Sequence, residues 1–452
     1  MGKIKKELVN KIRRKEARIT VVGLGRVGLP TVAVFADAGF SVMGVDINQE
    51  VVKAVSLGKS PIMEPKLNEM IKKVVKAGKL QATTKILTAT RNADIVILCV
   101  PTPLTSDGRQ NRTYLEKACK DMAKGLSGRK LVIVESTVAP GTVKNMVVEV
   151  LEEGSGLKCG EDFWLAFCPE RIAPGNAICE LTEGARIVGG YDSESARIAA
   201  EVFKLVTKGK ILTTDCGSAE VAKLAENTFR YVNIAFANEL ALICERLGVN
   251  VTEVTRLANS HSRVNIHRPG CGVGGPCLPK DPYLLLRSAE EKGFKSKVIK
   301  SSGEVNRYMP RHTTESVVKA LKIVGKDVGN SRVAVLGVSY KGEVDDVRNS
   351  PAMEVVRRLK GLGARVVVYD PYTDESFGAE RARDVSKAVE EADCVVIATD
   401  HRMFKELNLE GIKGLMRKKP VIVDCRQVVN GVEARKRGFK YFGIGHGDCT
   451  RA

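Results

Sequence analysis

The amino-acid sequence predicts an α/β protein with two Rossmann-like, doubly wound domains joined by a long central helical segment. Two units of strand, glycine turn and helix predict the two domains, and an uninterrupted helical repeat predicts the segment between them. At 452 residues the chain also exceeds what one core usually organises. We therefore expect a domain of residues 1–215, a central segment of residues 216–310 and a C-terminal domain of residues 311–452.

The first unit contains a complete dinucleotide-binding pattern. Residues 18–22 form a short β-branched run that leads directly into the turn of residues 23–28, Gly-Leu-Gly-Arg-Val-Gly. A helix-like stretch follows, and a second predicted strand, residues 41–45, ends at Asp46. Strand, turn, helix, strand and acid in this order predict a dinucleotide site at the start of the helix.

Each residue of this pattern has a physical role. Gly23 permits the tight turn, Gly25 lets a pyrophosphate approach the backbone, and Gly28 allows the helix to pack closely. The carboxylate of Asp46 would accept hydrogen bonds from the adenosine ribose. It would also repel a phosphate on that ribose, so the sequence predicts NAD rather than NADP as the cofactor.

The composition fits an enzyme with several parts and restricts its partners. The chain has 44% hydrophobic and 28% charged residues, and no apolar run approaches the length of a membrane span. A net charge of +19 is compatible with nucleic acid, an anionic membrane or an acidic small substrate. Because basic and acidic residues are mixed and the chain has one tryptophan, we predict a phosphorylated substrate, with neither nucleic acid nor membrane as a partner.

The cysteines and histidines indicate neither disulfides nor a metal site. The twelve cysteines include no CxxC pair, and the five histidines form no zinc-binding pattern. The first 18 residues are basic, have apolar residues at helical spacing and lack the apolar stretch of a secretory signal. We expect a solvated N-terminal helix on a reduced, cytoplasmic protein that binds no metal.

The second unit repeats the order of strand, turn and helix without the full glycine pattern. Residues 331–342 run from a β-branched strand into a turn that keeps only two glycines and carries Tyr340 and Lys341. These side chains suit a nucleotide base or phosphate better than a closely docked pyrophosphate. The unit is therefore predicted to be Rossmann-like without being a second NAD site.

One long helix is predicted between the two units. From residue 218 to residue 247 apolar residues recur at helical spacing without Gly or Pro, which corresponds to roughly 45 Å of helix. A helix of this length is a natural place for a dimer interface. Lys223 and Asn227 stand four residues apart on one face, where an ammonium and an amide could converge on one substrate oxygen. The alternative is a solvated surface pair.

Cys277 has the surroundings of a nucleophile. It lies at the end of a glycine-rich loop, residues 270–282, with Lys280 and Asp281 close behind it. Glycines allow close approach of backbone and substrate, Lys280 would favour the thiolate, and Asp281 could orient or relay a proton. The alternative is a small apolar cysteine that packs in a turn.

These features together resemble the nucleotide-sugar 6-dehydrogenases, the superfamily of UDP-glucose, GDP-mannose and UDP-N-acetylmannosamine dehydrogenases. The resemblance runs from about Arg18 to the C-terminus. Its landmarks are the glycine turn, Val100-Pro101-Thr102-Pro103, Glu135-Ser136-Thr137, Cys168-Pro169-Glu170-Arg171, Lys223 with Asn227, the loop from Cys277 to Asp281, and Lys341 with Asp345-Asp346-Val347-Arg348. The run from Arg263 to His267 and the glycines before Cys277 look most similar to the UDP-N-acetylmannosamine dehydrogenase branch.

One departure from the superfamily has chemical content. UDP-glucose dehydrogenases place a second glutamate four residues after the one that matches Glu170, and this chain has Pro174 there. Glu170 is then the only candidate on that loop for activating water. The acetamido-sugar enzymes resemble this chain in lacking the second acid, which agrees with the branch.

The resemblance implies a reaction and a set of site residues. The reaction is NAD-dependent four-electron oxidation of a UDP-N-acetylhexosamine, UDP-N-acetyl-D-mannosamine first among them, at carbon 6, through a thiohemiacetal and a thioester on cysteine. The implied catalytic residues are Cys277, Lys223, Asn227, Glu170, Asp281 and Thr137. The implied cofactor contacts are Gly23, Gly25, Arg26, Val27, Gly28, Asp46, Thr102, Thr137 and Arg348. The implied substrate contacts are Glu170, Arg171, Lys223, Asn227, Arg263, His267, Gly274 and Lys341.

The resemblance also implies a homodimer or higher homo-oligomer in which Arg263 reaches the nucleotide sugar of the neighbouring subunit. The alternatives within the superfamily are oxidation of UDP-glucose, UDP-N-acetylglucosamine or UDP-N-acetylgalactosamine, because no motif specifies the epimer. Outside it, one alternative is a single-step hydroxyacid dehydrogenase, which needs neither a cysteine nucleophile nor a second α/β domain. Another is a non-enzymatic protein that senses NAD or binds nucleic acid.

Overall fold

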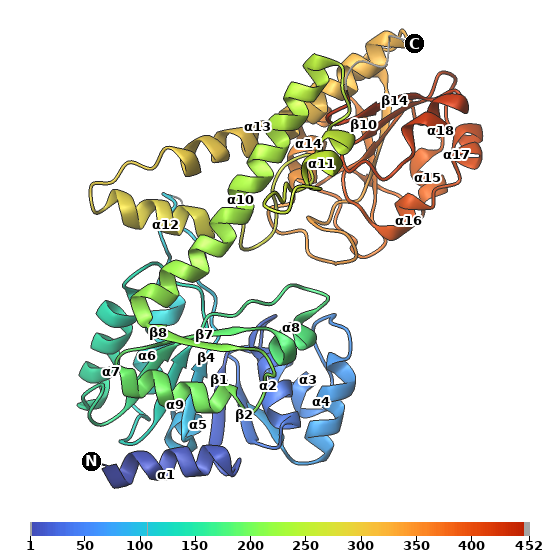
Figure 1. The fold of residues 1–452 in the computed structure, drawn as a ribbon. Coiled ribbons are helices and arrows are strands. Elements are labelled where there is room, and N and C mark those ends of the chain that lie inside the picture. Colours follow the sequence, from blue (N-terminus) through green and yellow to red (C-terminus); the bar gives the residue numbers. More distant parts are fainter. Residues whose placement is uncertain (1, 106, 447–452) are drawn as a thin grey trace. The chain divides into compact units, whose positions relative to one another are not determined.

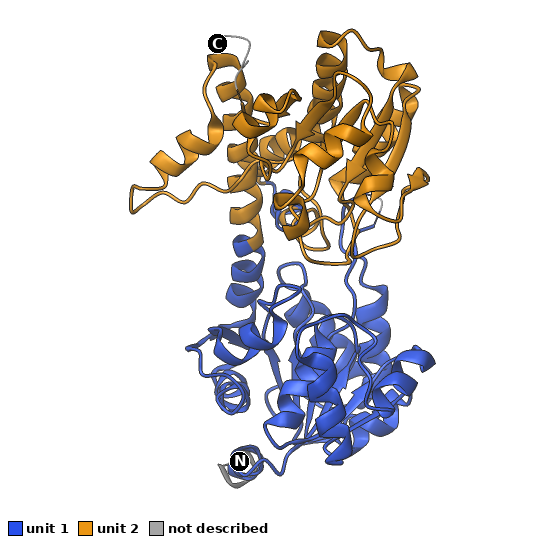
Figure 2. Cartoon of the chain, turned by 90° about the vertical axis from the view of Figure 1, so that its right-hand side faces the viewer, with its two compact units in different colours: residues 1–226, 283–293 blue, residues 227–282, 294–452 orange. Residues whose placement is uncertain are grey.

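The computed structural model describes residues 2–105 and 107–446, and the chain divides into two compact units (Figure 2). Unit 1 comprises residues 1–226 and 283–293, and unit 2 comprises residues 227–282 and 294–452. Each unit is a largely parallel sheet covered by helices (Figure 1), which confirms the predicted fold class. The first boundary between the units falls inside a helix, so the division at residues 215 and 310 stays a prediction.

Unit 1 is built around an eight-stranded sheet in the order β3-β2-β1-β4-β5-β6-β7-β8. The first six strands are parallel in the order of a dinucleotide-binding domain, and β7 joins β6 in the antiparallel direction. The strands are β1 (Arg18–Val22), β2 (Ser41–Val45), β3 (Leu80–Thr83), β4 (Ile95–Leu98), β5 (Leu131–Val134), β6 (Trp164–Phe167), β7 (Arg186–Gly190) and β8 (Ile211–Asp215).

Alternate residues of these strands enter two apolar clusters, one on each face of the sheet. Val21 of β1 packs in the cluster that contains Phe35 and Phe203, whereas Val22 packs in the cluster that contains Met122. Helices α1, α2, α4 and α9 supply the first cluster, and α5, α6 and α7 supply the second. The helices of this unit are α1 (Gly2–Arg13), α2 (Gly28–Asp37), α3 (Gln49–Ser56), α4 (Leu67–Lys76), α5 (Ile86–Asn92), α6 (Thr113–Ala123), the π-helix Val143–Val147, α7 (Val148–Ser155), α8 (Ala177–Glu183) and α9 (Ser193–Phe203).

Unit 2 is built around a six-stranded parallel sheet in the order β11-β10-β9-β12-β13-β14. The strands are β9 (Arg332–Leu336), β10 (Arg365–Tyr369), β11 (Glu380–Arg381), β12 (Cys394–Ile397), β13 (Val421–Asp424) and β14 (Lys440–Gly443). Helices α13 and α14 cover one face, and α15 to α18 cover the other. The helices are α11 (Val251–Ala258), α13 (Val298–Ile323), the 3-10 helix Val328–Asn330, α14 (Pro351–Gly361), α15 (Val385–Val389), α16 (Arg402–Lys405), α17 (Leu409–Leu415) and α18 (Gly431–Lys436).

Local sequence explains where key elements begin and end. Helix α14 starts at Pro351 and is capped by Ser350, whose hydroxyl accepts the N–H of Ala352. Helix α10 (Cys216–Leu247) has 32 residues and confirms the long helix expected from residue 218 to residue 247. It ends before Gly248, which has a φ of +75° and stops the helix in the left-handed conformation. Helix α12 (Asp281–Glu290) follows the loop that contains Cys277.

Helix α1 packs on unit 1, and the expectation of a solvated helix was wrong. Leu8, Val9 and Ile12 are buried in the core of unit 1, because they lie on one face of the amphipathic helix. Lys11 forms an ion pair of 3.2 Å with Asp94. The apolar face of α1 is therefore part of the domain core.

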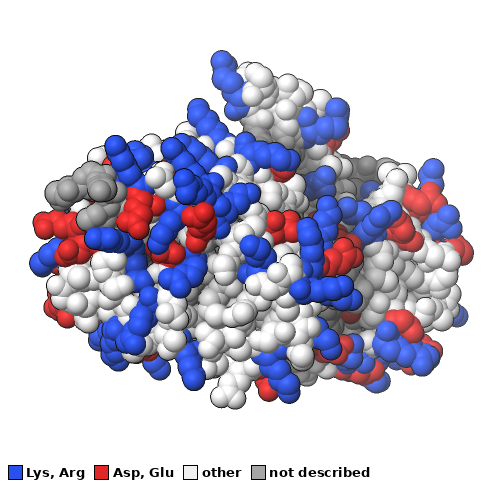
Figure 3. Space-filling model, turned by 90° about the horizontal axis from the view of Figure 1, so that it is seen from below, with Lys and Arg blue, Asp and Glu red and all other residues white. Residues whose placement is uncertain are grey.

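The distribution of surface charge and the character of the helices can be compared with the prediction that neither nucleic acid nor a membrane is a partner. In the view of Figure 3, Lys and Arg are scattered over the face with Asp and Glu among them. Within residues 2–105 and 107–446, no helix is long and apolar enough to cross a membrane.

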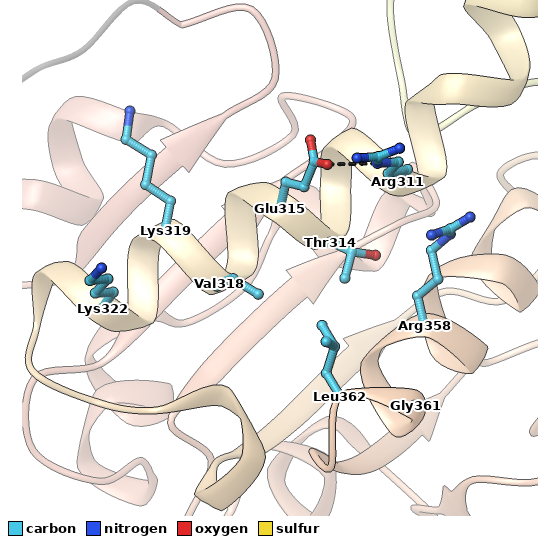
Figure 4. Close-up of a pocket in the computed structure, with 9 residues that line it drawn as sticks. All are labelled: Arg311, Thr314, Glu315, Val318, Lys319, Lys322, Arg358, Gly361 and Leu362. Atoms are coloured by element: carbon cyan, nitrogen blue, oxygen red, sulfur yellow. Dashed lines mark hydrogen bonds and ion pairs between the residues drawn. The ribbon is translucent and has the colours of Figure 1, made fainter.

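A cavity of about 530 Å³ lies between α13 and α14 in unit 2 (Figure 4). Its wall contains Arg311, Thr314, Glu315, Val318, Lys319, Lys322, Arg358, Gly361 and Leu362. None of the residues that the sequence predicts for the active site lines it.

Candidate active site

The glycine turn of unit 1 fits a dinucleotide. Gly23 has a φ of +95°, and a Cβ on Gly28 would lie 1.8 Å from the carbonyl oxygen of Gly23, so neither position accepts a side chain. A Cβ on Gly25 would meet nothing within 4 Å, which leaves the space that a pyrophosphate needs. Helix α2 begins at Gly28 and directs its N-terminal N–H groups to this space.

Asp46, which the sequence predicts to contact the adenosine ribose, directly follows β2. Its Oδ2 accepts the N–H of Leu24 at 2.8 Å, and its Oδ1 accepts the N–H of Asn48 at 2.9 Å. These two bonds orient the carboxylate, and each oxygen keeps a lone pair for a ribose hydroxyl. The residues of this turn therefore fit the predicted cofactor.

Glu170 and Lys223 form a buried ion pair in unit 1. The Nζ of Lys223 lies 3.0 Å from Oε1 of Glu170 and 2.7 Å from the carbonyl oxygen of the same residue. Burial opposes ionisation of Glu170. The charge of Lys223, the N–H of Ile172 and the hydrogen bond from Lys223 outweigh this effect and hold the pKa of Glu170 below its usual value. The structure thus brings together two residues that the sequence assigned to catalysis and keeps Glu170 as a carboxylate.

Other predicted residues of unit 1 have mainly internal partners. The hydroxyl of Thr102 donates to the carbonyl oxygen of Thr137 at 2.6 Å, and both residues are buried. The guanidinium of Arg171 donates to the carboxylate of Glu226 and to the carbonyl oxygen of Ala185. Arg171 was predicted to bind substrate, and here its charge is balanced by Glu226. Arg26 and Val27 lie in the glycine turn and are half-buried.

In unit 2, Asn227 is paired with Asp281. The Nδ2 of Asn227 donates to Oδ2 of Asp281 at 2.6 Å, and both residues are buried. The Nζ of Lys280 lies 3.6 Å from Oδ1 of Asp281. Because the carboxylate accepts a hydrogen bond from the Asn227 side-chain amide, the amide group has a fixed direction on α10. The sequence predicted both residues for the site but did not predict that they contact each other.

The loop that carries Cys277 packs tightly against other parts of unit 2. Gly275 has a φ of +93°, and a Cβ there would lie 2.8 Å from the ring of Tyr340. The N–H of Gly275 donates to the carbonyl oxygen of Arg348, and Asn349 donates from Nδ2 to the carbonyl oxygen of Gly275 at 3.1 Å. The conformation of this loop is therefore fixed from both sides, which holds the backbone near Cys277 in place.

Two features favour a thiolate at Cys277. Its carbonyl oxygen accepts the N–H groups of Lys280 and Asp281, so Cys277 opens the turn that leads into α12, where a helix N-terminus favours negative charge. The guanidinium of Arg348 is also within electrostatic range. The hydrogen bond to Asp346 raises the pKa of Arg348 against the effect of burial, and the charges of Asp346 and Cys277 add to this rise. By reciprocity the positive charge of Arg348 stabilises a negative charge on Cys277.

The remaining substrate residues lie on loops of unit 2. Lys341 is exposed in the turn after β9, and Arg263 is exposed in the loop that follows α11. The N–H of His267 donates to Oδ1 of Asn233 on α10, and burial lowers the pKa of its imidazole. Gly274 lies beside Tyr340, as Gly275 does.

Sequence reasoning missed the buried cluster at Glu135. Its Oε1 accepts Nη2 of Arg186 at 2.8 Å, and its Oε2 accepts the thiol of Cys99 and the hydroxyl of Thr31. Burial raises the pKa of Glu135 in spite of Arg186. Thr31 belongs to α2, the helix that starts at the glycine turn. The landmark Glu135-Ser136-Thr137 was the available signal, and it specified no partner for the carboxylate.

Models of the UDP-glucose/GDP-mannose dehydrogenase family match three parts of the chain. The NAD binding domain matches residues 17–207, the central domain matches residues 217–308, and the UDP binding domain matches residues 334–431. These parts contain the glycine turn, the loop of Cys277 and the residue Lys341 respectively.

Individual relatives agree with this match over nearly the whole chain. A UDP-N-acetyl-D-mannosamine dehydrogenase of Pyrococcus horikoshii is 42% identical over 431 residues, which is 95% of this chain and 100% of that protein. A solved structure of UDP-D-ManNAc dehydrogenase from Pyrococcus horikoshii superimposes with a TM-score of 0.89, at 42% identity, over 95% of this chain and 100% of that one.

A second structure is that of an NDP-N-acetyl-D-galactosaminuronic acid dehydrogenase from Methanosarcina mazei. It has a TM-score of 0.84 and 35% identity, over 97% of this chain and 98% of that one. Sequence, domain order and three-dimensional structure lead to the same assignment, and the chain belongs to the UDP-glucose/GDP-mannose dehydrogenase family.

Proposed function

We propose that the protein oxidises UDP-N-acetyl-D-mannosamine at carbon 6 to the uronic acid, with NAD as the acceptor. Cys277 carries the proposal, because its rigid glycine loop and the charge of Arg348 suit a covalent nucleophile, which a single-step dehydrogenase does not need. The choice of sugar rests on relatives such as the UDP-N-acetyl-D-mannosamine dehydrogenase of Pyrococcus horikoshii, at 42% identity.

In the first oxidation the primary alcohol becomes an aldehyde as it loses a hydride, and its hydroxyl proton passes to solvent water. Lys223 and Asn227 lie one turn apart on α10, and we assign to them the stabilisation of the negative charge on the substrate oxygen. Asp281 keeps the Asn227 amide directed to that oxygen. NAD bound at the glycine turn supplies the acceptor for the hydride in each of two rounds.

Cys277 retains the aldehyde and prepares it for the second oxidation. Its thiolate adds to the aldehyde carbon to form a thiohemiacetal, and loss of a second hydride and of the hydroxyl proton gives a thioester. Water then attacks the thioester carbon, and the C–S bond breaks to release the carboxylate and restore the thiolate. Glu170, ionised beside Lys223, accepts one proton of that water, and the other passes to solvent.

We assign nucleotide-sugar binding to Lys341, Arg263, His267 and Gly274, and cofactor contacts to Thr102, Thr137 and Arg348. Arg348 serves the site in a second way through its charge on Cys277. For Arg171 the bond to Glu226 favours a supporting role, in which it fixes the loop of Glu170 to α10. A reducing, cytoplasmic location suits the thiol of Cys277, which forms no disulfide.

We also propose a homodimer that forms along α10. Four large apolar side chains lie on one face of this helix, and their exposed fractions range from 46% to 70%. They are Phe229, Phe236, Ile243 and Leu247. A stripe of large exposed apolar side chains on one helix is typical of a protein interface. A second copy of the chain would bury the same stripe on both partners.

The test of the function is the stoichiometry of NADH release from a panel of UDP-N-acetylhexosamines and UDP-glucose. We expect turnover of UDP-N-acetyl-D-mannosamine with two NADH for each sugar and a uronic acid as the product. One NADH for each substrate and an aldehyde product would contradict the covalent route. Faster turnover of UDP-N-acetylgalactosamine would favour the second candidate substrate, which the Methanosarcina mazei relative supports.

A further inference from the structure

The turn of residues 339–343, here called the Lys341 turn, is held at both ends. It follows β9 and carries Lys341 to the carboxyl edge of the sheet in unit 2. At its first end, the N–H and the hydroxyl of Ser339 both donate to Oδ2 of Asp370. At its last end stands Glu343, which has a φ of +63° although it is not glycine. The left-handed conformation is unfavourable in free energy for any residue other than glycine, so contacts with the surroundings must stabilise it at Glu343.

His401 supplies the main contact to this strained residue. Its side chain is fully buried, its Nδ1 accepts the N–H of Glu343 at 3.1 Å, and its Nε2 lies 3.1 Å from Oδ2 of Asp370. The backbone N–H can only donate, so Nδ1 carries no proton. The carboxylate of Asp370 can only accept, because the hydrogen bonds of His401 and Ser339 overcome burial and lower its pKa. Nε2 therefore donates to Asp370 while Nδ1 accepts from Glu343, so both nitrogens of His401 are in use.

The side chain of Glu343 completes the arrangement. Its Oε1 accepts the N–H of Arg402 at 2.7 Å, and its Oε2 accepts the hydroxyl of Tyr372 at 2.8 Å. The ring of Tyr372 stacks on the imidazole of His401, with centroids 5.0 Å apart. Backbone and side chain of Glu343 are thus bonded to the segment that follows β12.

We propose that His401 is a positioning residue that holds Glu343 in the left-handed conformation and so places Lys341 for the nucleotide sugar. This inference rests on the proposed function, because that function assigns the substrate contact to Lys341. The same turn carries Tyr340, whose ring lies against the glycine loop of Cys277. Without the bond from Glu343 to His401, the last residue of the turn would relax and Lys341 would lose its fixed place.

Two substitutions distinguish the contributions of the two ring nitrogens of His401. His401→Asn keeps an acceptor at the place of Nδ1 and loses the group at Nε2, whereas His401→Gln keeps a donor at the place of Nε2 and loses the acceptor for Glu343. We expect His401→Gln to raise the KM for the nucleotide sugar about five-fold, and His401→Asn to change it by less than about two-fold. The KM for NAD should stay near the wild-type value in both. Equal effects of the two variants, or a larger effect of Asn, would overturn the proposal.

A second pair of variants keeps the buried imidazole intact. Glu343→Ala removes the bonds to Arg402 and Tyr372 from a side chain that is 51% exposed, so folding should not be affected. Glu406→Ala is the matched control, because Glu406 is exposed and pairs with the side chain of Arg402 without touching the turn. We expect the first variant to raise the KM for the nucleotide sugar about three-fold and the second to leave it unchanged. The same KM for both variants would count against the proposal.

Calorimetric titration with UDP distinguishes this proposal from the proposed function. If Lys341→Ala leaves UDP affinity unchanged, the assignment of Lys341 fails, and with it the reason for positioning. If Lys341→Ala weakens UDP binding and His401→Gln does not, His401 has no positioning role while the function stands. If no nucleotide sugar is oxidised but His401→Gln still weakens UDP binding about five-fold relative to His401→Asn, the positioning is supported and the assigned reaction is wrong.

Discussion

The ammonium of Lys223 bridges two oxygens of Glu170, the carboxylate Oε1 at 3.0 Å and the main-chain carbonyl at 2.7 Å. Lys223 therefore fixes the position of the glutamate as well as its charge. In the proposed reaction the pair has two functions, since Lys223 stabilises an oxyanion and Glu170 later accepts a proton from water.

Glu170→Gln should separate oxidation from hydrolysis. Because the amide cannot accept the proton of the attacking water, we expect a burst of NADH followed by accumulation of a thioester on Cys277, which mass spectrometry of the quenched enzyme would detect. Glu180→Gln is the control, since Glu180 contacts the same loop through the N–H of Ala173. Loss of all activity without burst or adduct would assign Glu170 to an earlier step.

Glu170 should also make stability depend on pH in the acid range. Its folded-state pKa lies below the usual value of about 4.3, so the ionised group stabilises the fold above that value, and the contribution is lost as the pH falls through the folded pKa. We expect the difference in the free energy of unfolding between wild type and Glu170→Gln to shrink between about pH 6 and about pH 3. Urea denaturation at a series of pH values measures it. A constant difference would mean that the pKa is not lowered.

Arg348→Ala should make Cys277 less reactive. If the guanidinium stabilises the thiolate, its loss should slow alkylation of Cys277 by iodoacetamide several-fold at about pH 7.5. Peptide mass spectrometry must follow Cys277 itself, because Cys179 is an exposed thiol. Arg357→Ala on α14, an exposed arginine paired with Glu354, is the control and should leave the rate unchanged. An unchanged alkylation rate in Arg348→Ala would show that the charge of Arg348 does not activate the thiol of Cys277.

Asp46→Ala tests the choice of cofactor. Loss of a charged hydrogen bond to the ribose should weaken the binding of NAD by about 1.5 to 3 kcal/mol. Because the carboxylate would no longer repel the ribose phosphate of NADP, the difference in affinity between NAD and NADP should become smaller. Fluorescence titration with both cofactors measures the two affinities. The side chain also accepts the N–H of Leu24, so a thermal melt should confirm that the fold is retained. Unchanged affinity for both cofactors would place the adenosine elsewhere.

Phe236→Glu should weaken the proposed dimer. A charge in the middle of the exposed stripe of α10 would have to be buried without a partner on association. We expect analytical ultracentrifugation to show a shift toward monomer, whereas Lys319→Glu on α13 should leave the mass unchanged. A mixture of Arg263→Ala and Cys277→Ala subunits should recover activity if Arg263 serves the neighbouring site. A fully active wild-type monomer would exclude the shared site.

Local patterns were sufficient to predict the elements that surround the cofactor turn. Strands β1 and β2 occupy the expected residues, because β-branched runs that end in a glycine or an aspartate permit few alternatives. Helix α10 begins two residues before the expected start. The burial of α1 could not be predicted from its charge, because the packing partner of its apolar face is α9, far along the chain.

The candidate site was predicted as a set of residue types but not as a set of contacts. Glu170 and Lys223 are 53 residues apart in sequence, and Asn227 and Asp281 are 54 apart. No local pattern determines which carboxylate an ammonium or an amide will meet. Arg171 illustrates the difficulty, since a guanidinium suits a substrate phosphate and the carboxylate of Glu226 equally well. His401 belongs to no motif and gains meaning only when the fold places it beside Asp370.

Asp46 follows β2 in unit 1, and Asp370 follows β10 in unit 2. The different contacts of these two aspartates limit how the nucleotide specificity of the protein can be redesigned. Asp46 accepts two backbone N–H groups and keeps room for a ribose, but Oδ2 of Asp370 already receives the N–H groups of Val338 and Ser339 and contacts His401. Grafting a cofactor-binding glycine motif onto unit 2 would therefore fail unless this imidazole were also removed. An engineer who wants a different nucleotide specificity should leave Asp370 untouched and vary the exposed side of the Lys341 turn.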